Sequence, residues 1–190
     1  MVDKLKLPFK FDTGKLKADL AKISADEWIG HFNKSNYEGV WSVVPLRGQK
    51  GAVHPVQQIT SMPGVTEYED TAYMERCPYI KEAVYTLQCP LTSVRLMSLH
   101  AGSIIKEHKD YSLGYEDGEV RIHIPVKTND DVMFMFKGER VIMGEGEMWY
   151  LDFGQPHAIE NRGLQDRIHI VIDCKVNEWL KELFITHQTY

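Results

Sequence analysis

Short runs of alternating apolar and polar residues dominate the second half of the chain. They begin after residue 90 and are separated by turn-forming Gly, Pro, Asn and Asp. Alternation with a period of two predicts strands with one buried face, and short strands at such spacing are typical of a sandwich or barrel. The predicted strands are residues 93–99, 120–126, 132–136, 140–143, 147–151 and 167–172.

The first half of the chain and its C-terminal end carry apolar residues at helical spacing instead. Residues 40–46, which include Trp41, alternate weakly and favour a strand, and residues 48–70 are rich in Gly, Pro and polar residues and predict a long loop. The predicted helices are residues 15–23, with Asp12 or Thr13 as the cap, 25–31, 78–87, which begin with Pro78, and 177–184.

One tetrapeptide occurs twice, because Arg121-Ile-His123-Ile is repeated as Arg167-Ile-His169-Ile. In a strand, each copy directs its Arg and His to one face and its two Ile residues to the other. Two interpretations remain open from the sequence. Either the likeness is coincidental, or both strands line one polar interior.

Composition narrows the class of protein. The 190 residues fit a single domain, with a helical and loop part at 1–90, a strand-rich core at 91–175 and a C-terminal helix and tail at 176–190. The 22 basic and 27 acidic residues give a net charge of −5 without a basic stripe, which argues against nucleic acid as a partner. No apolar run approaches the roughly 20 residues of a membrane span, and the N-terminus lacks an apolar signal core, so a cytoplasmic location is expected. Oligomeric state is left open.

Histidine, rather than cysteine, carries the candidate chemistry. The three cysteines form no C-x-x-C pair, whereas His108-x-Asp110 and a later Pro-His157 supply two imidazoles and one carboxylate. That donor set is the one a non-haem Fe(II) oxygenase needs on one face of its metal. His-x-Asp alone is a weak signal, because it occurs by chance in many proteins. Arg167, on the next predicted strand, strengthens it, since a buried guanidinium close to a metal needs an anion and suits a dicarboxylate.

The combined pattern resembles the aspartyl/asparaginyl β-hydroxylase family of Fe(II)- and 2-oxoglutarate-dependent dioxygenases, and within it the bacterial L-proline cis-4-hydroxylase type. The similarity is best between residues 95 and 173, and Asp110 favours the bacterial branch because the animal enzymes lack this carboxylate. The residues that carry it are Arg95, His100, Gly102, His108, Arg121, His123, Gly146, Glu147, Trp149, Asp152, Pro156, His157 and Arg167.

The resemblance implies a mainly β fold with flanking helices, namely a double-stranded β-helix (a cupin-like jelly-roll) with an N-terminal helical layer. It implies Fe(II), 2-oxoglutarate and dioxygen as cofactor and co-substrates, and a small amino acid as the substrate. The implied metal ligands, which are also the catalytic residues, are His108, Asp110 and His157. Arg167 is implied to bind 2-oxoglutarate, together with Arg121 and His123, while Trp41 and Arg95 are implied to hold the substrate.

Two alternatives stay open. The enzyme could hydroxylate Asp, Asn or another residue in a peptide, which an open groove would favour over a closed cavity. A cupin-like module that does not use 2-oxoglutarate would replace Asp110 by His123 or His169 in the ligand set.

Five further polar residues have simpler interpretations. His169 is expected to make a structural contact in the barrel, and Asp152 either orients a metal-bound histidine or caps a turn. His31, His54 and His187 are expected at the surface.

Overall fold

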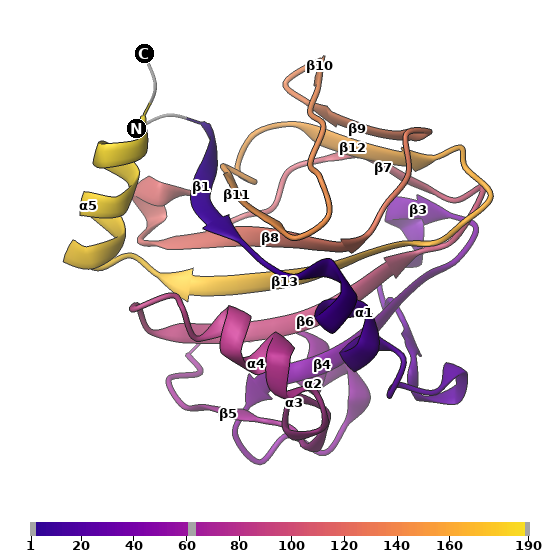
Figure 1. Cartoon of the computed structure of the whole chain (residues 1–190), viewed down its shortest axis with the longest axis horizontal. Helices are drawn as coiled ribbons and strands as arrows, with labels where there is room; N and C mark the ends of the chain where they lie inside the picture. The colour runs from indigo at the N-terminus through magenta and orange to yellow at the C-terminus, as the bar shows by residue number, and fades with distance from the viewer. Residues whose placement is uncertain (1–2, 61–63, 189–190) are drawn as a thin grey trace.

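Two antiparallel sheets face each other in the computed structural model, which describes residues 3–60 and 64–188 (Figure 1). The larger sheet has the order β1 (Lys4–Lys10), β11 (Glu147–Leu151), β8 (Glu119–Lys127), β13 (Arg167–Lys175), β6 (Leu91–Leu99), β4 (Trp41–Gln49) and β2 (Ile29–Gly30), with β5 (Tyr68–Asp70) paired to β4. The smaller sheet has the order β10 (Glu139–Arg140), β9 (Val132–Phe136), β12 (His157–Asn161), β7 (Ile104–His108) and β3 (Tyr37–Glu38). The predicted jelly-roll with flanking helices is confirmed.

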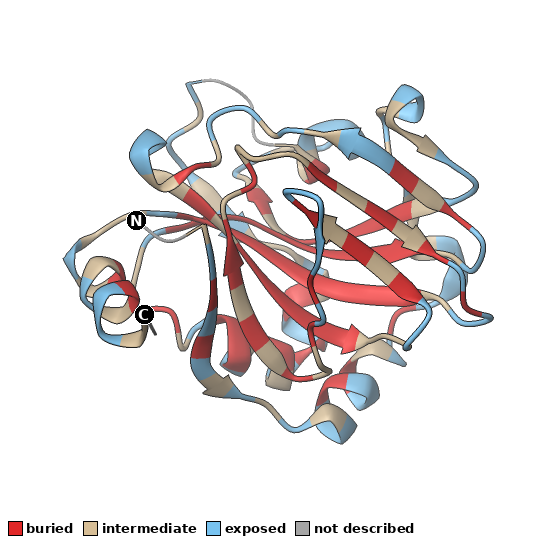
Figure 2. Cartoon of the chain, turned by 90° about the horizontal axis from the view of Figure 1, so that it is seen from above, coloured by how far each residue is buried: buried red, intermediate tan, exposed pale blue. Residues whose placement is uncertain are grey.

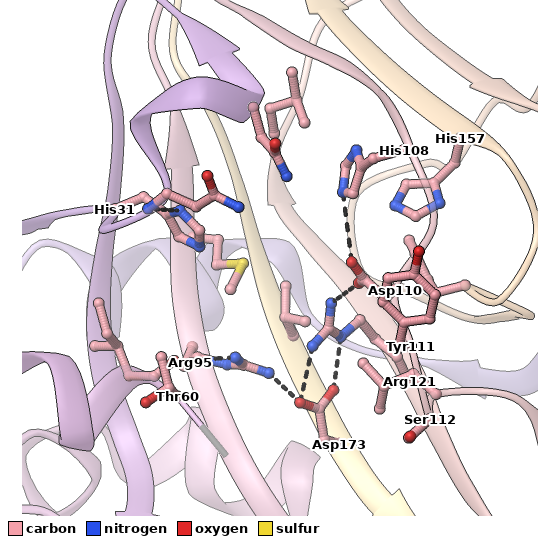
Figure 3. Close-up of a pocket in the computed structure, with 18 of the residues that line it drawn as sticks. His31, Thr60, Arg95, His108, Asp110, Tyr111, Ser112, Arg121, His157 and Asp173 are labelled. Carbon is pink, nitrogen blue, oxygen red and sulfur yellow. Dashed lines mark hydrogen bonds and ion pairs between the residues drawn. The ribbon is translucent and has the colours of Figure 1, made fainter. Parts of the chain in front are cut away.

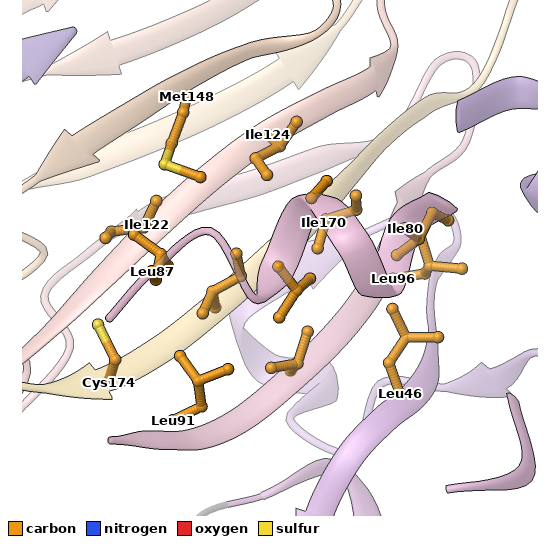
Figure 4. Packing of buried hydrophobic residues seen from close by; sticks show 14 of the residues in the cluster. Leu46, Ile80, Leu87, Leu91, Leu96, Ile122, Ile124, Met148, Ile170 and Cys174 are labelled. Carbon is orange, nitrogen blue, oxygen red and sulfur yellow. The ribbon is translucent and has the colours of Figure 1, made fainter. Parts of the chain in front are cut away.

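Alternation along the central strands separates two environments. The isoleucines of the repeated tetrapeptide point away from the smaller sheet, where Ile122, Ile124 and Ile170 pack against helices (Figure 4). The helices involved are α1 (Thr13–Leu20), α3 (Ala72–Arg76), α4 (Pro78–Val84) and α5 (Glu178–His187). Their apolar residues bury the outer face of the larger sheet, which makes this cluster the main hydrophobic core.

Side-chain caps join the helices of this layer. Asp12 accepts a hydrogen bond from the backbone N–H of Lys15 and begins α1, as predicted. Asp19, at the other end of α1, is buried and accepts hydrogen bonds from Tyr79 N and Ile80 N at 2.7 and 2.9 Å. Because these N–H groups lie in the first turn of α4, one carboxylate fixes the packing of two helices.

The space between the sheets has a second apolar core and a polar region. Leu99, Phe134 and Phe153 belong to this core, and buried residues line the facing sides of both sheets (Figure 2). On the polar side, β8 and β13 pair so that His123 lies opposite Val171 and Arg121 opposite Asp173. Both copies of the repeated tetrapeptide therefore direct their Arg and His into one interior, which confirms the second interpretation.

Several elements differ from the prediction. The helix predicted at residues 25–31 is wrong, because the chain forms a 3-10 turn at Ala25–Glu27 and then enters β2, which pairs with β4. The predicted loop at residues 48–70 contains α2 (Pro55–Ile59) and β5, and its residues 61–63 lie outside the described residues. Of the strand predicted at 140–143 only Arg140 pairs, in β10.

Four further strands, one helix and two turns were absent from the prediction. They are β1, β3, β7 and β12, helix α3, and the 3-10 turns Lys34–Asn36 and Tyr115–Asp117. The part at 1–90 is therefore not only helical, since it also supplies strands to both sheets. Among the described residues no helix is long and apolar enough to span a membrane.

Candidate active site

The predicted metal ligands meet where β7 and β12 lie side by side. His108 ends β7, His157 begins β12, and the pairing of the two strands places these histidines directly opposite each other, with ring centroids 4.3 Å apart. Asp110 follows β7, and its backbone N–H donates to the carbonyl oxygen of Phe153 at 2.9 Å. One ligand atom from each of the three side chains lies within 4.8 Å of the others (Figure 3).

Hydrogen bonds set the protonation of both imidazoles. Nδ1 of His108 lies 2.7 Å from the carbonyl oxygen of Lys106, and Nδ1 of His157 lies 2.9 Å from that of Gln155. A carbonyl oxygen only accepts, so Nδ1 carries the proton and Nε2 presents its lone pair. Burial lowers the pKa of His157 to about 4, which keeps it neutral near pH 7. Two Nε2 atoms beside a carboxylate therefore fit a divalent cation such as Fe(II).

A series of ion pairs connects Asp110, through Arg121 and Asp173, to Arg95. Asp110 forms an ion pair with Nη1 of Arg121, whose Nε and Nη2 donate to the two oxygens of Asp173 at 2.7 and 3.0 Å. Asp173 also pairs with Arg95. Burial alone would raise the pKa of Asp173, but Arg121 and Arg95 hold it below its usual value. Each arginine of this network thus has an acidic partner.

Arg167 lacks such a partner. Only 4% of the residue is exposed, its Nε has no hydrogen-bond partner among the described residues, and its Nη2 lies 2.9 Å from Nδ1 of His169. Burial lowers the pKa of Arg167 to about 9. Its guanidinium lies 5.7 Å from the centre of the Phe134 ring, and neither this ring nor the imidazole neutralises the charge. A buried cation without a counter-ion is a site for an anion.

Two histidines lie close to Arg167: His169 on the same strand, β13, and His123 on the neighbouring strand β8. Their Nδ1 atoms lie 3.3 Å apart, and the Nε2 atoms of both are buried without a partner in the described chain. Burial, followed by the charge of Arg167, lowers the pKa of each well below its usual value. Neither belongs to the group of metal-ligating atoms, whereas Asp110 does. The donor set required for the cupin-like alternative is therefore not assembled.

One cavity of about 690 Å³ between the sheets contains the residues singled out in the sequence. His169 does not line it and makes the structural contact predicted for it. Asp152 accepts from Gly154 N at 3.0 Å, which matches the turn-capping interpretation. The predicted site residues that line the cavity are Trp41, Arg95, His108, Asp110, Arg121, His123, His157 and Arg167.

Two lining residues were missed. Asp173 shares the strand face of Arg167 and His169, so strand alternation could have placed it in the interior. His31 was expected at the surface, yet it is half-buried in the cavity wall and stacks on Trp41 with 3.6 Å between ring centroids. No local pattern indicates this position, because it follows from the pairing of β2 with β4.

Comparisons with known proteins match most of the chain. The family model for aspartyl/asparaginyl β-hydroxylases matches residues 11–176. An L-proline cis-4-hydroxylase of Rhizobium meliloti (strain 1021) is 26% identical over 167 residues, which cover 86% of this chain and 58% of that protein. The chain thus spans less than two thirds of its relative's length.

Solved structures share the fold at low sequence identity. The α-ketoglutarate-dependent epimerase SnoN from nogalamycin biosynthesis superposes with a TM-score of 0.56 and 12% identity, covering 91% of this chain and 78% of its own. An oxidoreductase of the 2OG-Fe(II) oxygenase family from Burkholderia pseudomallei has a TM-score of 0.54 and 10% identity, with 86% and 79% covered. Both likenesses support the jelly-roll assignment.

Proposed function

Because the chain belongs to the aspartyl/asparaginyl β-hydroxylase family, we propose that it is an Fe(II)- and 2-oxoglutarate-dependent dioxygenase that hydroxylates a free small amino acid. One observation carries the proposal: the His108, Asp110 and His157 group shares a cavity with Arg167, a buried cation for which the described part of the chain supplies no counter-ion. Bound Fe(II) would activate dioxygen and, with 2-oxoglutarate as reductant, insert one oxygen atom into a C–H bond with release of succinate and carbon dioxide.

Different residues of the chain would bind the metal and 2-oxoglutarate. His108, Asp110 and His157 would hold the metal through two Nε2 atoms and one carboxylate. Arg167 would pair with the distal carboxylate of 2-oxoglutarate, since its fork suits a planar anion. His123, with its buried Nε2 free, would donate to or accept from the same co-substrate, and Arg121 would orient Asp110.

The remaining lining residues would hold the substrate and keep water out. Trp41 and Arg95 lie on neighbouring strands of the larger sheet, β4 and β6, and both line the cavity. Ile105, Phe134 and Phe153 form apolar walls around the histidines. A dry, preorganised site favours reaction at the bound substrate over wasteful turnover of 2-oxoglutarate.

Succinate formation with Fe(II), 2-oxoglutarate and a panel of free L-amino acids tests the proposal. We expect one or more members, with L-proline as the first candidate because of the Rhizobium meliloti relative, to raise succinate formation and to gain one oxygen atom by mass spectrometry. The matched compounds L-prolinamide and N-acetyl-L-proline imitate a residue within a peptide. Stimulation by the blocked compounds but not by free amino acids would favour the peptide alternative, and no stimulation by either would remove the small-amino-acid assignment.

A further inference from the structure

A cluster of aromatic residues lies at the cavity opposite the metal group. His31 stacks on Trp41 at a centroid distance of 3.6 Å and an interplanar angle of 10°, and Phe32 and Tyr37 complete the cluster. The backbone holds the imidazole in place, since His31 N donates to Trp41 O at 2.8 Å and Tyr37 Oη donates to His31 O at 3.2 Å. Figure 3 shows His31 across the cavity from His108. The ring therefore has a fixed orientation toward the shared space.

The hydrogen bonds of His31 determine which nitrogen carries its proton. Asn33 N–H donates to Nδ1 at 3.3 Å, so Nδ1 presents its lone pair to the backbone and the proton of the neutral ring resides on Nε2. Burial, and then the charges of Arg95 and Arg121, lower the pKa of His31 to about 4, so the ring is neutral at physiological pH. Among the described residues Nε2 makes no hydrogen bond. His31 thus offers one N–H donor without a partner.

A second donor without a partner lies in the same cavity. Arg95 uses Nη1 for the carbonyl oxygen of Ile59 and Nη2 for Asp173, and its Nε has no partner in the described chain. Donors require acceptor oxygens, and a carboxylate offers two. The opposite histidines and Arg167 are assigned to the metal and the co-substrate, and His31 and Arg95 both line the part of the cavity that remains for the substrate.

We propose that His31 is a substrate-binding residue whose Nε2–H donates to a carboxylate oxygen of the free amino acid. The inference rests on the proposed function and sharpens it, because a charged carboxylate accepts a stronger hydrogen bond than the carbonyl oxygen of a residue within a peptide and therefore favours the free amino acid. The stacked Trp41 ring gives His31 its rigidity, and a preorganised donor loses little freedom when the substrate binds.

Anaerobic titration calorimetry of the Fe(II)- and 2-oxoglutarate-loaded protein with L-proline, and with any panel member that stimulates turnover, tests the role of the donor. His31→Phe keeps the stacked ring and removes the donor, so the affinity should fall about 10- to 100-fold. His31→Gln places an amide N–H near the Nε2 position and should stay within about threefold of the wild type. For L-prolinamide, whose amide oxygen is a weaker acceptor than a carboxylate, His31→Phe should reduce the affinity less than it does for L-proline.

His54 supplies a matched control. Its Nδ1 accepts from the backbone N–H two residues further on, at 3.2 Å, as His31 does, but it is exposed at the start of α2 and does not line the cavity. His54→Phe should therefore leave the affinity for the amino acid unchanged. The melting temperature and the affinity for 2-oxoglutarate, measured for every variant, report on the fold and on the rest of the cavity.

The possible results distinguish failure of the donor role of His31 from failure of the proposed function. Wild-type affinity in His31→Phe, or a loss in His31→Gln as large as in His31→Phe at an unchanged melting temperature, would overturn the donor role and leave the proposed function standing. Failure of the wild type to bind any free amino acid would overturn both. Independently of any ligand, the ¹⁵N spectrum of His31, assigned by its absence in His31→Gln, should show the Nε2–H tautomer. The opposite tautomer would also overturn the inference.

Discussion

Replacement of Arg167 by methionine should weaken binding of 2-oxoglutarate and, at the same time, stabilise the unliganded protein. Burial alone lowers the pKa of this arginine to about 9, which corresponds to several kcal/mol of lost solvation at about 1.4 kcal/mol per pKa unit. The Phe134 ring and Nδ1 of His169 recover part of this cost. Methionine has a similar length and carries no charge, so Arg167→Met removes the cost and keeps most of the packing.

The expected gain for the protein without metal or 2-oxoglutarate is about 1–3 kcal/mol in the free energy of unfolding, because buried charges replaced by apolar side chains often stabilise by this amount. For a chain of this size the gain corresponds to a melting temperature about 3–10 °C higher. The affinity of the metal-loaded protein for 2-oxoglutarate should fall about 100- to 1,000-fold, which is about 3–4 kcal/mol, through loss of a buried charge pair.

Differential scanning calorimetry measures the first effect, and anaerobic titration calorimetry measures the second. Arg162→Met is the control, because Arg162 is exposed and pairs with Glu160 at the surface. It should change neither quantity by more than a small amount. A lower melting temperature in Arg167→Met together with an unchanged affinity for 2-oxoglutarate would refute the reasoning, since Arg167 would then be a structural residue without a role in anion binding.

Three further predictions concern the metal group, the acid stability and the helical layer. His108→Ala and His157→Ala should each reduce bound Fe(II), measured by equilibrium dialysis under nitrogen, to a small fraction of one equivalent; full retention would contradict the ligand assignment. Burial would raise the pKa of Glu147, but hydrogen bonds lower it from 4.5 to about 2, so its contribution, about 1–2 kcal/mol after solvent screening, is present above about pH 5 and lost as the pH falls toward 2. Glu147→Gln should therefore flatten the unfolding free energy between these pH values in urea titrations, and an unchanged slope would exclude this origin. Asp19→Ala should lower the unfolding free energy by about 2–3 kcal/mol, because two backbone N–H groups of α4 lose their buried acceptor; a loss under about 0.5 kcal/mol would show that the cap is dispensable.

Strand alternation made much of the interior predictable. The repeated Arg-Ile-His-Ile tetrapeptide assigns its side chains to opposite faces without knowledge of the partner strands, and the pairing of β8 with β13 then brings both polar faces together. The metal group was predictable for another reason, because His108-x-Asp110 and His157 supply two imidazoles and a carboxylate, and the surrounding pattern resembles a family that uses this donor set. Strand parity carried the first prediction, and the resemblance carried the second.

The predictions that were wrong depended on contacts between segments that lie far apart in the sequence. The segment predicted as a helix at residues 25–31 does begin with a turn, in which Glu27 accepts the N–H of Ser24, but the pairing of β2 with β4 draws the chain into an extended form after that turn. The position of His31 follows from this pairing, so it could not be predicted from the local sequence. The omission of β1 is different, because Leu5 and Leu7 alternate with lysines and the signal was present in the sequence.

The pairing of His108 with His157 on neighbouring strands also affects how the protein resists proteolysis. His108 closes β7 and His157 opens β12, so a bound metal would act as a removable cross-link between segments far apart in the sequence. Such a cross-link reduces the entropy of the opened chain in the way a disulfide does, without requiring an oxidising environment. Iron supply would thus set the lifetime of the protein against proteases as well as its capacity for turnover.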